Sequence, residues 1–394
     1  MTPEVANPPS ASASSTARPR VLHVIDHTGA GGAQAVLRDL IGTLKDRYTF
    51  GVAVLGASGT YSTQYAALGA TILELGTHSS RWSFAPLGGV IAAICHGHYD
   101  LVHTHLFKGN TLGVFAARLA GRRVILHDYS GATPEVLRYF LPNWLIGTSY
   151  LLAYRLGIGL SQRAIVLTEQ LRVAYERSYH CDPRKLLVLP NPVDVTRFAD
   201  CRRSGNLRAT LGIAETTPLS FMLGRLDPEK DWPTFLRVAE ELQRRGRTCA
   251  CLVVGSGTEE PMLREYARTH HLDQVHFLGY YANILELFGQ ADLFLQTSRI
   301  EALPVVILEA MASRLPVVAT RTSGAVALIE HDVDGLLADV GDAVGLAQAV
   351  IRLLDDSALR DRLAACARQK VVASYSLEVV AARVAALYDE VLAG

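Results

Sequence analysis

The chain has 394 residues, more than one ordinary hydrophobic core accommodates, so two domains are expected. Its 38 basic and 38 acidic residues balance, which argues against a dedicated nucleic-acid-binding protein. The balance is uneven along the chain, because residues 1–190 contain 17 basic and 11 acidic residues whereas residues 191–394 contain 21 and 27.

The first 19 residues are rich in Ser, Ala and Pro and lack the apolar core of a signal peptide, so residues 1–19 predict a disordered tail. The six cysteines follow no metal-ligand spacing, which is typical of free thiols in a reducing cytosol. The longest uncharged apolar stretch, between Arg138 and Arg155, is shorter than the roughly 20 residues of a membrane-spanning helix. The sequence therefore predicts a soluble, cytoplasmic protein.

Residues 20–193 predict a first domain in which strands and helices alternate over short loops, as in a parallel sheet covered on both faces. The first expected strand is followed by the glycine-rich segment TGAGGA (28–33) and by a helix from about Gln34 to Lys45. The expected strands are 20–27, 50–56, 71–75, 100–105, 123–128, 164–168 and 185–191.

A polar stretch over residues 194–206 predicts a linker, after which the alternating pattern begins again over residues 207–376. The expected strands of this second domain are 218–225, 249–255, 275–279, 291–298 and 316–320. The last segment, 377–394, predicts a helix with no strand after it, and we expect it to pack back on the N-terminal domain. Ligands of doubly wound sheets bind beyond the carboxyl ends of the strands, so two such α/β domains facing each other would share a central cleft.

Two glutamates flank an apolar run in the segment EALPVVILE (301–309). Glu301 follows an expected strand, and Glu309 falls within the first two turns of a helix that Pro304 can open. Carboxylates at this edge of a sheet can accept hydrogen bonds from pairs of sugar hydroxyls. The spacing is equally compatible with one exposed loop glutamate and one glutamate paired with an arginine.

The segment LGRLDPEKDW (223–232) supplies positive charge at the same edge of the second sheet. Arg225 and Lys230 precede a helix that Asp231 is expected to cap, and together with the helix N-terminus they form an anion site suited to a diphosphate. The alternative is that these cations pair with the neighbouring Asp227 or Glu229.

Two glycine-containing turns follow other strands. In VVGSG (253–257) the missing side chains of Gly255 and Gly257 would let a flat ring approach the backbone. In TGAGGAQ, Gln34 stands where a dinucleotide fingerprint has its third glycine, and no acid lies between Asp46 and Glu74 to hold a ribose. The sequence therefore does not predict an NAD site.

Three histidines end two strands that we expect to be adjacent. His103 and His105 share a face of their strand and could offer two zinc ligands, with a third from His127 or Asp128. Nothing in the sequence requires a metal there, and a buried, hydrogen-bonded histidine is the interpretation that we favour for His103. His105 is a secondary candidate for a ligand contact.

In their order along the chain, four segments resemble the family 4 branch of the GT-B glycosyltransferases, which are retaining, nucleotide-sugar-dependent enzymes with two Rossmann-like domains. The resemblance extends over nearly all of residues 20–392. The four segments are PNPVD (190–194), GRLDPEK (224–230), VVGSG (253–257) and the Glu-x7-Glu pattern of 301–309.

The resemblance implies that Glu309 holds the ribose hydroxyls of the donor and that Glu301 holds a hydroxyl of the transferred sugar. It also implies that Arg225 and Lys230 hold the diphosphate without a metal ion. Relatives commonly carry a glutamate where this chain has Ala327, so the contacts of that residue are not transferred.

The same resemblance implies that the backbone amides of Leu303 and Val305 contact the donor. Gly31 and Gly32 would line the cleft near the donor phosphates and the acceptor. His127 would lie beside the transferred sugar as its hydrogen-bonding partner.

The resemblance implies a retaining glycosyltransferase that moves a sugar from a nucleoside-diphosphate sugar, with UDP favoured over GDP, to a hydroxyl acceptor. The expected acceptor is a lipid-linked or glycan precursor in cell-envelope polysaccharide synthesis, with no cofactor and no metal. The alternatives are a nucleotide-sugar epimerase on the same fold and a non-catalytic sugar-nucleotide-binding protein.

Residues 138–155 are rich in aliphatic and aromatic side chains and carry no charge between two arginines. Such a segment can lie in a membrane interface, with Tyr139, Phe140 and Trp144 meeting lipid. It can equally be a core helix of the first domain that is interrupted near Pro142. The first possibility predicts a peripheral enzyme at the cytoplasmic face of the membrane.

Overall fold

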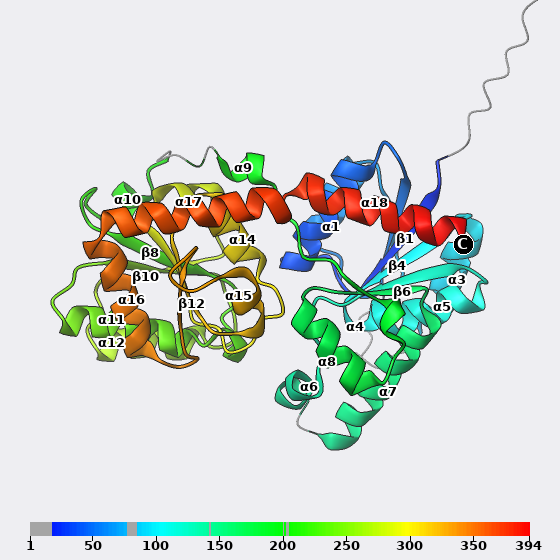
Figure 1. Cartoon of the computed structure of the whole chain (residues 1–394), viewed down its shortest axis with the longest axis horizontal. Coiled ribbons are helices and arrows are strands. Elements are labelled where there is room, and N and C mark those ends of the chain that lie inside the picture. Colours follow the sequence, from blue (N-terminus) through cyan, green and yellow to red (C-terminus); the bar gives the residue numbers. More distant parts are fainter. Residues whose placement is uncertain (1–17, 77–84, 142, 200, 202–204) are drawn as a thin grey trace, which may run out of the picture.

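The structure is a computed structural model that describes residues 18–76, 85–141, 143–199, 201 and 205–394. Most of the predicted tail, part of the predicted linker and Pro142 lie outside the described residues. Two α/β domains lie side by side along the long axis of the molecule (Figure 1). The predicted fold class, two Rossmann-like domains, is confirmed.

The N-terminal sheet, as far as the chain is described, has seven parallel strands in the order β3-β2-β1-β4-β5-β6-β7. Its strands are β1 (Arg20–Ile25), β2 (Thr49–Val54), β3 (Thr71–Glu74), β4 (Leu101–His105), β5 (Arg123–His127), β6 (Arg163–Val166) and β7 (Leu186–Val188). Its helices are α1 (Gly32–Leu44), α2 (Thr60–Ala67), α3 (Pro86–His96), α4 (Leu106–Lys108), the π-helix η1 (Gly109–Gly113), α5 (Val114–Leu119), α6 (Pro134–Phe140), α7 (Trp144–Leu160), α8 (Glu169–Tyr179) and the 3₁₀ helix η2 (Pro183–Lys185).

The C-terminal sheet has six parallel strands among the described residues, in the order β10-β9-β8-β11-β12-β13. Its strands are β8 (Leu219–Leu223), β9 (Ala250–Val254), β10 (Val275–Gly279), β11 (Leu293–Gln296), β12 (Val317–Thr320) and β13 (Leu336–Ala338). Its helices are α9 (Val195–Ala199), α10 (Leu207–Thr210), the 3₁₀ helix η3 (Pro228–Lys230), α11 (Trp232–Arg244), α12 (Glu260–Thr269), α13 (Ile284–Gln290), α14 (Val305–Ala312), α15 (Ser323–Leu328), α16 (Ala343–Asp355) and α17 (Ser357–Ser374).

The strand order reverses once in each sheet, between β1 and β4 in the first and between β8 and β11 in the second. At such a switch point the loops after the two central strands diverge and leave a crevice beyond their carboxyl ends. The central strands are buried on both faces, which explains why their sequences are almost continuously apolar. The two switch points therefore define where each domain can hold a ligand.

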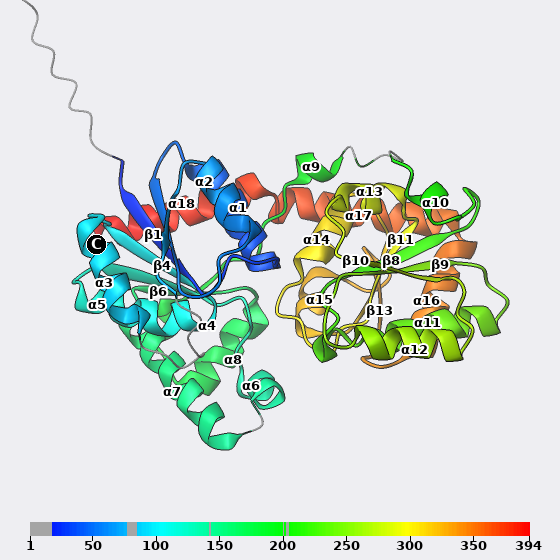
Figure 2. The same ribbon diagram turned by 180° about the vertical axis from the view of Figure 1, so that it is seen from behind.

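The chain passes between the domains twice, and the two passages lie side by side. The amide of Val193 donates to the carbonyl of Tyr375 at 2.9 Å, and the amide of Leu377 donates to the carbonyl of Val193 at 2.9 Å. The second passage leads from α17 on the C-terminal domain to α18 (Leu377–Ala393) on the N-terminal domain. Both helices follow one side of the molecule (Figures 1 and 2).

Helix α18 belongs to the core of the N-terminal domain. Val380, Val384 and Tyr388 recur every fourth residue and are buried against α1 and the first sheet. The Tyr48 hydroxyl donates a hydrogen bond of 2.6 Å to Oδ1 of Asp389. The core of the first domain is thus closed by a segment that follows the second domain in sequence.

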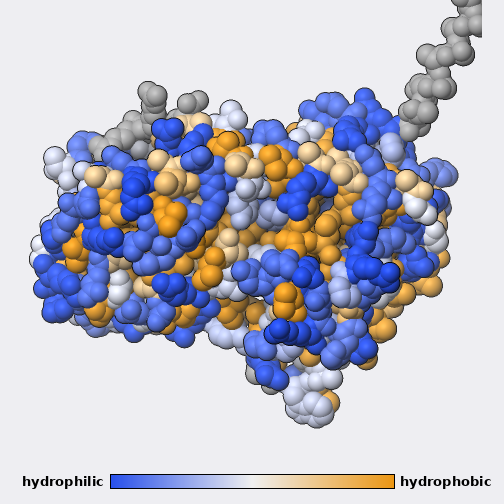
Figure 3. Space-filling view, viewed as in Figure 1, coloured by the Kyte–Doolittle hydropathy of each residue, from blue (hydrophilic) through white to orange (hydrophobic). Residues whose placement is uncertain are grey.

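Helices α6 and α7 form a projection from the N-terminal domain (Figures 1 and 2). Tyr150 and Tyr154 of α7 pack inward, whereas Trp144 and Leu145 at its start are 73% and 59% exposed. The tip of the projection is pale rather than blue in Figure 3, as expected for side chains of intermediate hydropathy. No helix in the described part of the chain is long and apolar enough to cross a membrane.

Candidate active site

The loops at the two switch points lie against each other where the domains meet. Gly32 begins α1, and a Cβ added there would lie 3.3 Å from Cγ2 of Val305, the first residue of α14. Gly31 has an extended backbone, and a Cβ there would lie 2.3 Å from Oε1 of its neighbour Gln34. The structure thus brings Gly32 of the first domain directly against the Glu-x7-Glu segment of the second.

One hydrogen bond links the motif residues of the two domains in this region. The side chain of Asn191, which belongs to the PNPVD segment, donates to the carbonyl oxygen of Leu303 at 2.9 Å. Leu303 is buried, and Val305 two residues later is half-buried. The contact fixes the backbone of the 301–305 loop against the end of the first domain.

Glu301 lies at the centre of a polar cluster at the second switch point. Its Oε1 accepts hydrogen bonds from Lys230 Nζ at 2.5 Å, Gln296 Nε2 at 2.7 Å and Ser298 Oγ at 2.8 Å. Lys230 follows β8 and Glu301 follows β11, which are neighbours in the sheet. The adjacent strands bring the cation and the carboxylate together, although they are 71 residues apart in sequence.

Arg225 is more exposed than Lys230. It forms ion pairs with the neighbouring Asp227 and Glu229, which is the alternative that the sequence analysis gave for this residue. Its guanidinium contacts Asp227 at 2.5 Å and Glu229, while its side chain is 66% exposed. The Arg225 carbonyl accepts a hydrogen bond of 2.7 Å from Nε1 of the buried Trp232. The loop is therefore held by its backbone, and the guanidinium remains accessible at its surface.

Asp231 stands at the N-cap position of α11, as predicted, but its side chain does not cap the backbone. Its Oδ2 accepts a hydrogen bond from the Thr234 hydroxyl at 2.8 Å, and Oδ1 contacts Arg299 at 3.1 Å. Asp231 adopts the left-handed conformation, with φ of 51°, which reorients the chain from η3 into α11. The residue positions the loop that carries Lys230.

Glu309 lies on α14 at the interface with the N-terminal domain and is only 9% exposed. Burial raises the pKa of its carboxyl group to about 8, because the charged form is poorly solvated there. The charges of Arg197 and Arg38 lower this pKa, and the charge of Asp39 raises it. These three residues come from α9 and α1, and the sequence analysis did not identify them, because no local pattern relates them to Glu309.

Gly255 and Gly257 allow the loops after β8 and β9 to pack closely. A Cβ at Gly255, whose φ is +137°, would lie 1.8 Å from the Gly224 carbonyl oxygen. A Cβ at Gly257 would lie 2.5 Å from the Leu226 carbonyl oxygen. Both glycines therefore have a packing role beside the predicted approach of a ligand ring.

His127 ends β5 and is 2% exposed. Neither of its ring nitrogens has a hydrogen-bond partner among the described residues, and its ring stacks on Tyr129 with centroids 4.1 Å apart. Burial, together with the nearby His23, lowers the pKa of His127 to about 3, so the ring is neutral at physiological pH. A neutral ring can both donate and accept a hydrogen bond.

His103 and His105 are fully buried on β4. Nδ1 of His103 is 2.6 Å from the Tyr388 hydroxyl, and Nε2 of His105 is 2.8 Å from Nδ1 of His23. The third ring of this group is thus His23 of β1, where the sequence had suggested His127 or Asp128. Asp128 instead accepts hydrogen bonds from the buried hydroxyls of neighbouring tyrosines.

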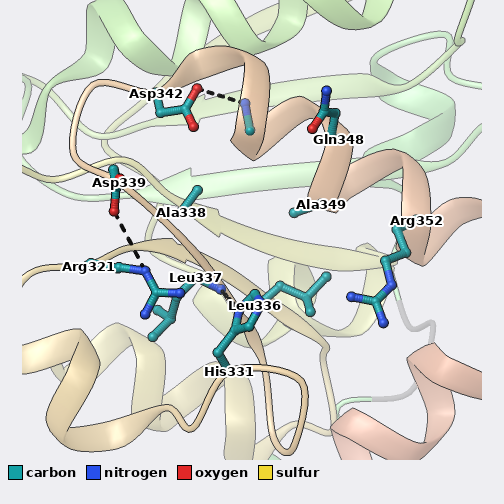
Figure 4. Close-up of a pocket in the computed structure, with 11 residues that line it drawn as sticks. Arg321, His331, Leu336, Leu337, Ala338, Asp339, Asp342, Gln348, Ala349 and Arg352 are labelled. Carbon is teal, nitrogen blue, oxygen red and sulfur yellow. Dashed lines mark hydrogen bonds and ion pairs between the residues drawn. The ribbon is translucent and has the colours of Figure 1, made fainter.

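A separate surface hollow of about 390 Å³ lies between β13 and α16 (Figure 4). Arg321 and Arg352 are among the residues that line it. Nε of Arg321 lies 3.7 Å from Oδ1 of Asp339, and Nη1 of Arg352 lies 2.5 Å from Oδ1 of Asp332. These cations are already paired, and the hollow is formed by elements other than those that carry Lys230 and Glu301. It does not belong to the candidate site.

Two family models match the chain. The model described as "Glycosyltransferase Family 4" matches residues 30–197, and the model described as "Glycosyl transferases group 1" matches residues 204–370. Between them they cover most of both domains and all the predicted site residues.

Two curated relatives illustrate the sequence similarity. The UDP-Gal:alpha-D-GlcNAc-diphosphoundecaprenol alpha-1,3-galactosyltransferase of Escherichia coli is 27% identical over 291 residues, which cover 71% of this chain and 72% of the relative. The GDP-mannose-dependent monoacylated alpha-(1-6)-phosphatidylinositol monomannoside mannosyltransferase of Corynebacterium glutamicum is 32% identical over 206 residues. That alignment covers 50% of this chain and 54% of the relative, so this chain spans about half the length of the second enzyme.

The fold is shared with solved structures over almost the whole chain. The crystal structure of HepE from Anabaena in complex with UDP-glucose superposes with a TM-score of 0.81. The match covers 94% of this chain and 99% of HepE at 23% sequence identity, a similarity that shows the fold.

Proposed function

The chain belongs to the GT-B glycosyltransferases of the family 4 type, and we propose that it transfers a sugar from a nucleoside-diphosphate sugar to a hydroxyl acceptor with retention of configuration. The observation that carries this proposal is the cluster at the second switch point. There, Lys230 and Glu301 meet beyond the carboxyl ends of adjacent parallel strands, where ligands of such sheets bind.

In the proposed complex the diphosphate lies between the loop after β8 and the start of α14. Lys230 has three N–H donors, so it can contact a phosphate oxygen while it remains paired with Glu301. The exposed guanidinium of Arg225 can release one of its carboxylate partners and form two parallel hydrogen bonds to a phosphate group instead. Both cations then stabilise the charge that develops on the leaving diphosphate, with no metal required.

The two glutamates have different proposed partners. Glu301 has a second oxygen beyond the one that accepts three hydrogen bonds, and that oxygen can accept a hydroxyl of the transferred sugar. Glu309 would accept the ribose hydroxyls. The amides of Leu303 and Val305, together with Gly31 and Gly32, would line the rest of the donor site.

His127 is the proposed partner of the sugar from the first domain. Its unpartnered ring nitrogens support this role, because buried polar atoms without a partner are rare in folded proteins. Its neutral state suits a hydrogen bond to an uncharged hydroxyl.

The configuration at the anomeric carbon would be retained because the acceptor hydroxyl attacks this carbon from the same face that the diphosphate leaves. The bond between the anomeric carbon and the β-phosphate oxygen breaks, the bond to the acceptor oxygen forms, and the departing phosphate oxygen takes the acceptor proton. This path uses no protein nucleophile, and the protein contributes positioning and charge stabilisation.

We favour a UDP-sugar as donor, since the E. coli relative is named for UDP-galactose and HepE was crystallised with UDP-glucose. The C. glutamicum relative is named for GDP-mannose, so the base is the first property to test. Both curated relatives are named for acceptors that carry lipid. A lipid-linked or glycan precursor is therefore the proposed acceptor, reached at the cytoplasmic face of the membrane through the α6–α7 projection.

The deciding experiment incubates the full chain with radiolabelled UDP- and GDP-sugars, with and without a polyprenyl-diphosphate sugar acceptor. The proposal expects label in the lipid fraction only when both substrates are present. An epimerised sugar nucleotide formed without acceptor would identify the epimerase, and binding without any turnover would identify a non-catalytic protein. Either outcome would overturn the proposed transfer.

A further inference from the structure

Four histidines lie on one face of the N-terminal sheet because of its register. His23 of β1 is the Cα partner of His103 on β4, and His105 of β4 is the Cα partner of His127 on β5. His103 and His105 are two residues apart on one strand, so their side chains point to the same face. This is the face covered by α1 and α18.

Three of these rings are arranged closely enough to share an ion. One ring nitrogen from each of His23, His103 and His105 lies within 4.8 Å of the other two, and all three side chains are buried. Nδ1 of His103 is hydrogen-bonded to the Tyr388 hydroxyl at 2.6 Å. A hydrogen bond at one ring nitrogen of a histidine fixes the tautomer and orients the other nitrogen toward a metal.

The cluster also contains polar atoms that lack partners. Among the described residues these are Nε2 of His23, Nε2 of His103, Nδ1 of His105, both ring nitrogens of His127 and the hydroxyl of Tyr129. Burying such an atom without a hydrogen bond is unfavourable, because it loses its contacts with water and gains none in the protein. Six of them around one small volume indicate that something binds there.

We propose that His23, His103 and His105 form a structural site for a late first-row divalent metal ion, of which Zn²⁺ is the representative. Imidazole nitrogens suit Zn²⁺, Cu²⁺ and Ni²⁺, whereas Mg²⁺ and Ca²⁺ require oxygen ligands. The fourth position of a tetrahedral site would be a water that the unpartnered groups of His127 or Tyr129 hold. This inference goes beyond the proposed function and does not depend on it.

Proton balance permits binding without a charged ligand. Nδ1 of His23 and Nε2 of His105 now share a hydrogen-bonding proton. This proton must leave the space between the two nitrogens when the ion binds there. It can move to the far nitrogen of the ring that donates it, which is Nε2 if the donor is His23 and Nδ1 if the donor is His105, and both of these atoms are unpartnered.

The site would join segments that are distant in sequence. The three ligands tie β1 to β4, and the hydrogen bond from His103 to Tyr388 extends the link to α18. A bound ion would therefore stabilise the association of α18 with the rest of the first domain.

The test uses the full chain purified without a histidine tag, stripped with a chelator and then titrated with Co²⁺ and Zn²⁺. The expected result is one equivalent bound, a visible Co²⁺ spectrum of a nitrogen-coordinated tetrahedral ion, and a higher Tm in the presence of either metal. Stripped wild-type protein that binds no stoichiometric metal and keeps the same Tm would overturn the proposal without any variant.

Variants locate the site. His105→Gln and His103→Gln should lose the Co²⁺ spectrum and the metal-dependent rise in Tm, while His96→Gln, at an exposed histidine of α3, should keep both. Tyr388→Phe keeps the three ligands and should weaken metal binding about 10- to 100-fold. Binding that persists in His105→Gln but disappears in His96→Gln would assign the ion to the surface and contradict the proposal.

Discussion

The ammonium nitrogen of Lys230 lies 2.5 Å from Oε1 of Glu301, and both side chains are largely buried at the end of adjacent strands. In the absence of substrate each group therefore neutralises the other. A nucleotide sugar brings negative phosphate toward the lysine and neutral hydroxyls toward the glutamate. The ion pair can thus remain formed while each partner contacts a different part of the donor.

Replacing the two cations should slow transfer strongly. Lys230→Ala and Arg225→Ala are each expected to reduce kcat/KM by about 10²–10³, the loss typical of one charged contact to a transition state. Steady-state kinetics with the donor found by the labelling experiment measure the effect. The control is Arg268→Ala, at an exposed arginine paired with Glu265 on α12, and it should leave kcat/KM unchanged. Full activity in the double variant, with an unchanged circular dichroism spectrum, would contradict the diphosphate role.

The two glutamates should differ in which ligand they recognise. Glu309→Gln is expected to weaken binding of the nucleoside diphosphate itself about tenfold or more, because its proposed ribose contact is present without a sugar. Glu301→Gln should leave that affinity nearly unchanged and weaken binding of the intact nucleotide sugar. Calorimetry with both ligands on both variants measures the difference. Equal losses for the two variants would contradict this division of roles.

The buried Glu309 should make stability depend on pH. Its pKa is about 8 in the folded protein against a usual value of 4.5, so the folded state binds the proton more tightly than the unfolded state. The sign follows from linkage: the contribution of this group is most favourable below pH 4.5 and is lost as pH rises through about 8.

Glu309→Gln removes this dependence. The Tm of the variant should therefore rise relative to the Tm of the wild type as the pH increases from 5 to 8.5. Thermal unfolding at several pH values measures the difference, and Glu378→Gln, at an exposed glutamate of α18, provides the control. Parallel Tm profiles for wild type and Glu309→Gln would show that the carboxyl group is not destabilised by burial.

The α6–α7 projection should bind anionic membranes. Trp144 and Leu145 are exposed at its tip, and basic residues exceed acidic ones in residues 1–190, so association is expected at low salt and should weaken at high salt. The measurement is co-sedimentation with vesicles of anionic and of neutral lipid.

The double variant Trp144→Ser/Leu145→Ser should lose most of this binding. Tyr280→Ser removes an equally exposed aromatic side chain from the C-terminal domain and should have no effect. Wild-type protein that stays in the supernatant at low salt, yet is fully active on a water-soluble acceptor, would exclude the membrane role.

Most of the fold followed from the sequence because parallel strands buried on both faces leave a strong signal. Each strand expected from the apolar runs coincides with an observed strand in the described residues. The strand β13 was missed, since three residues, Leu336–Ala338, give too little pattern to distinguish a strand from a turn. Segment boundaries differ by up to three residues, the largest difference being at the end of β7, which was expected at residue 191 and lies at Val188.

The candidate site was only partly predictable. The proximity of Lys230 and Glu301 follows from strand adjacency, which the alternating pattern implies. The surroundings of Glu309 could not be predicted, since Arg38 and Asp39 belong to the other domain and reach it only through the packing of the two domains. The contact of His23 with His105 likewise depends on the pairing of β1 with β4, which no local motif records.

The position of α18 has a consequence for how the protein is made. A ribosome delivers the seven strands of the first sheet early, but the helix that covers part of that sheet emerges only after the second domain has been synthesised. Until then α1 covers only part of the apolar face around Val21, Ile25 and Leu101. The second domain can therefore fold on the nascent chain before the first is complete, and the first domain remains accessible to chaperones and proteases while the second half of the chain is synthesised.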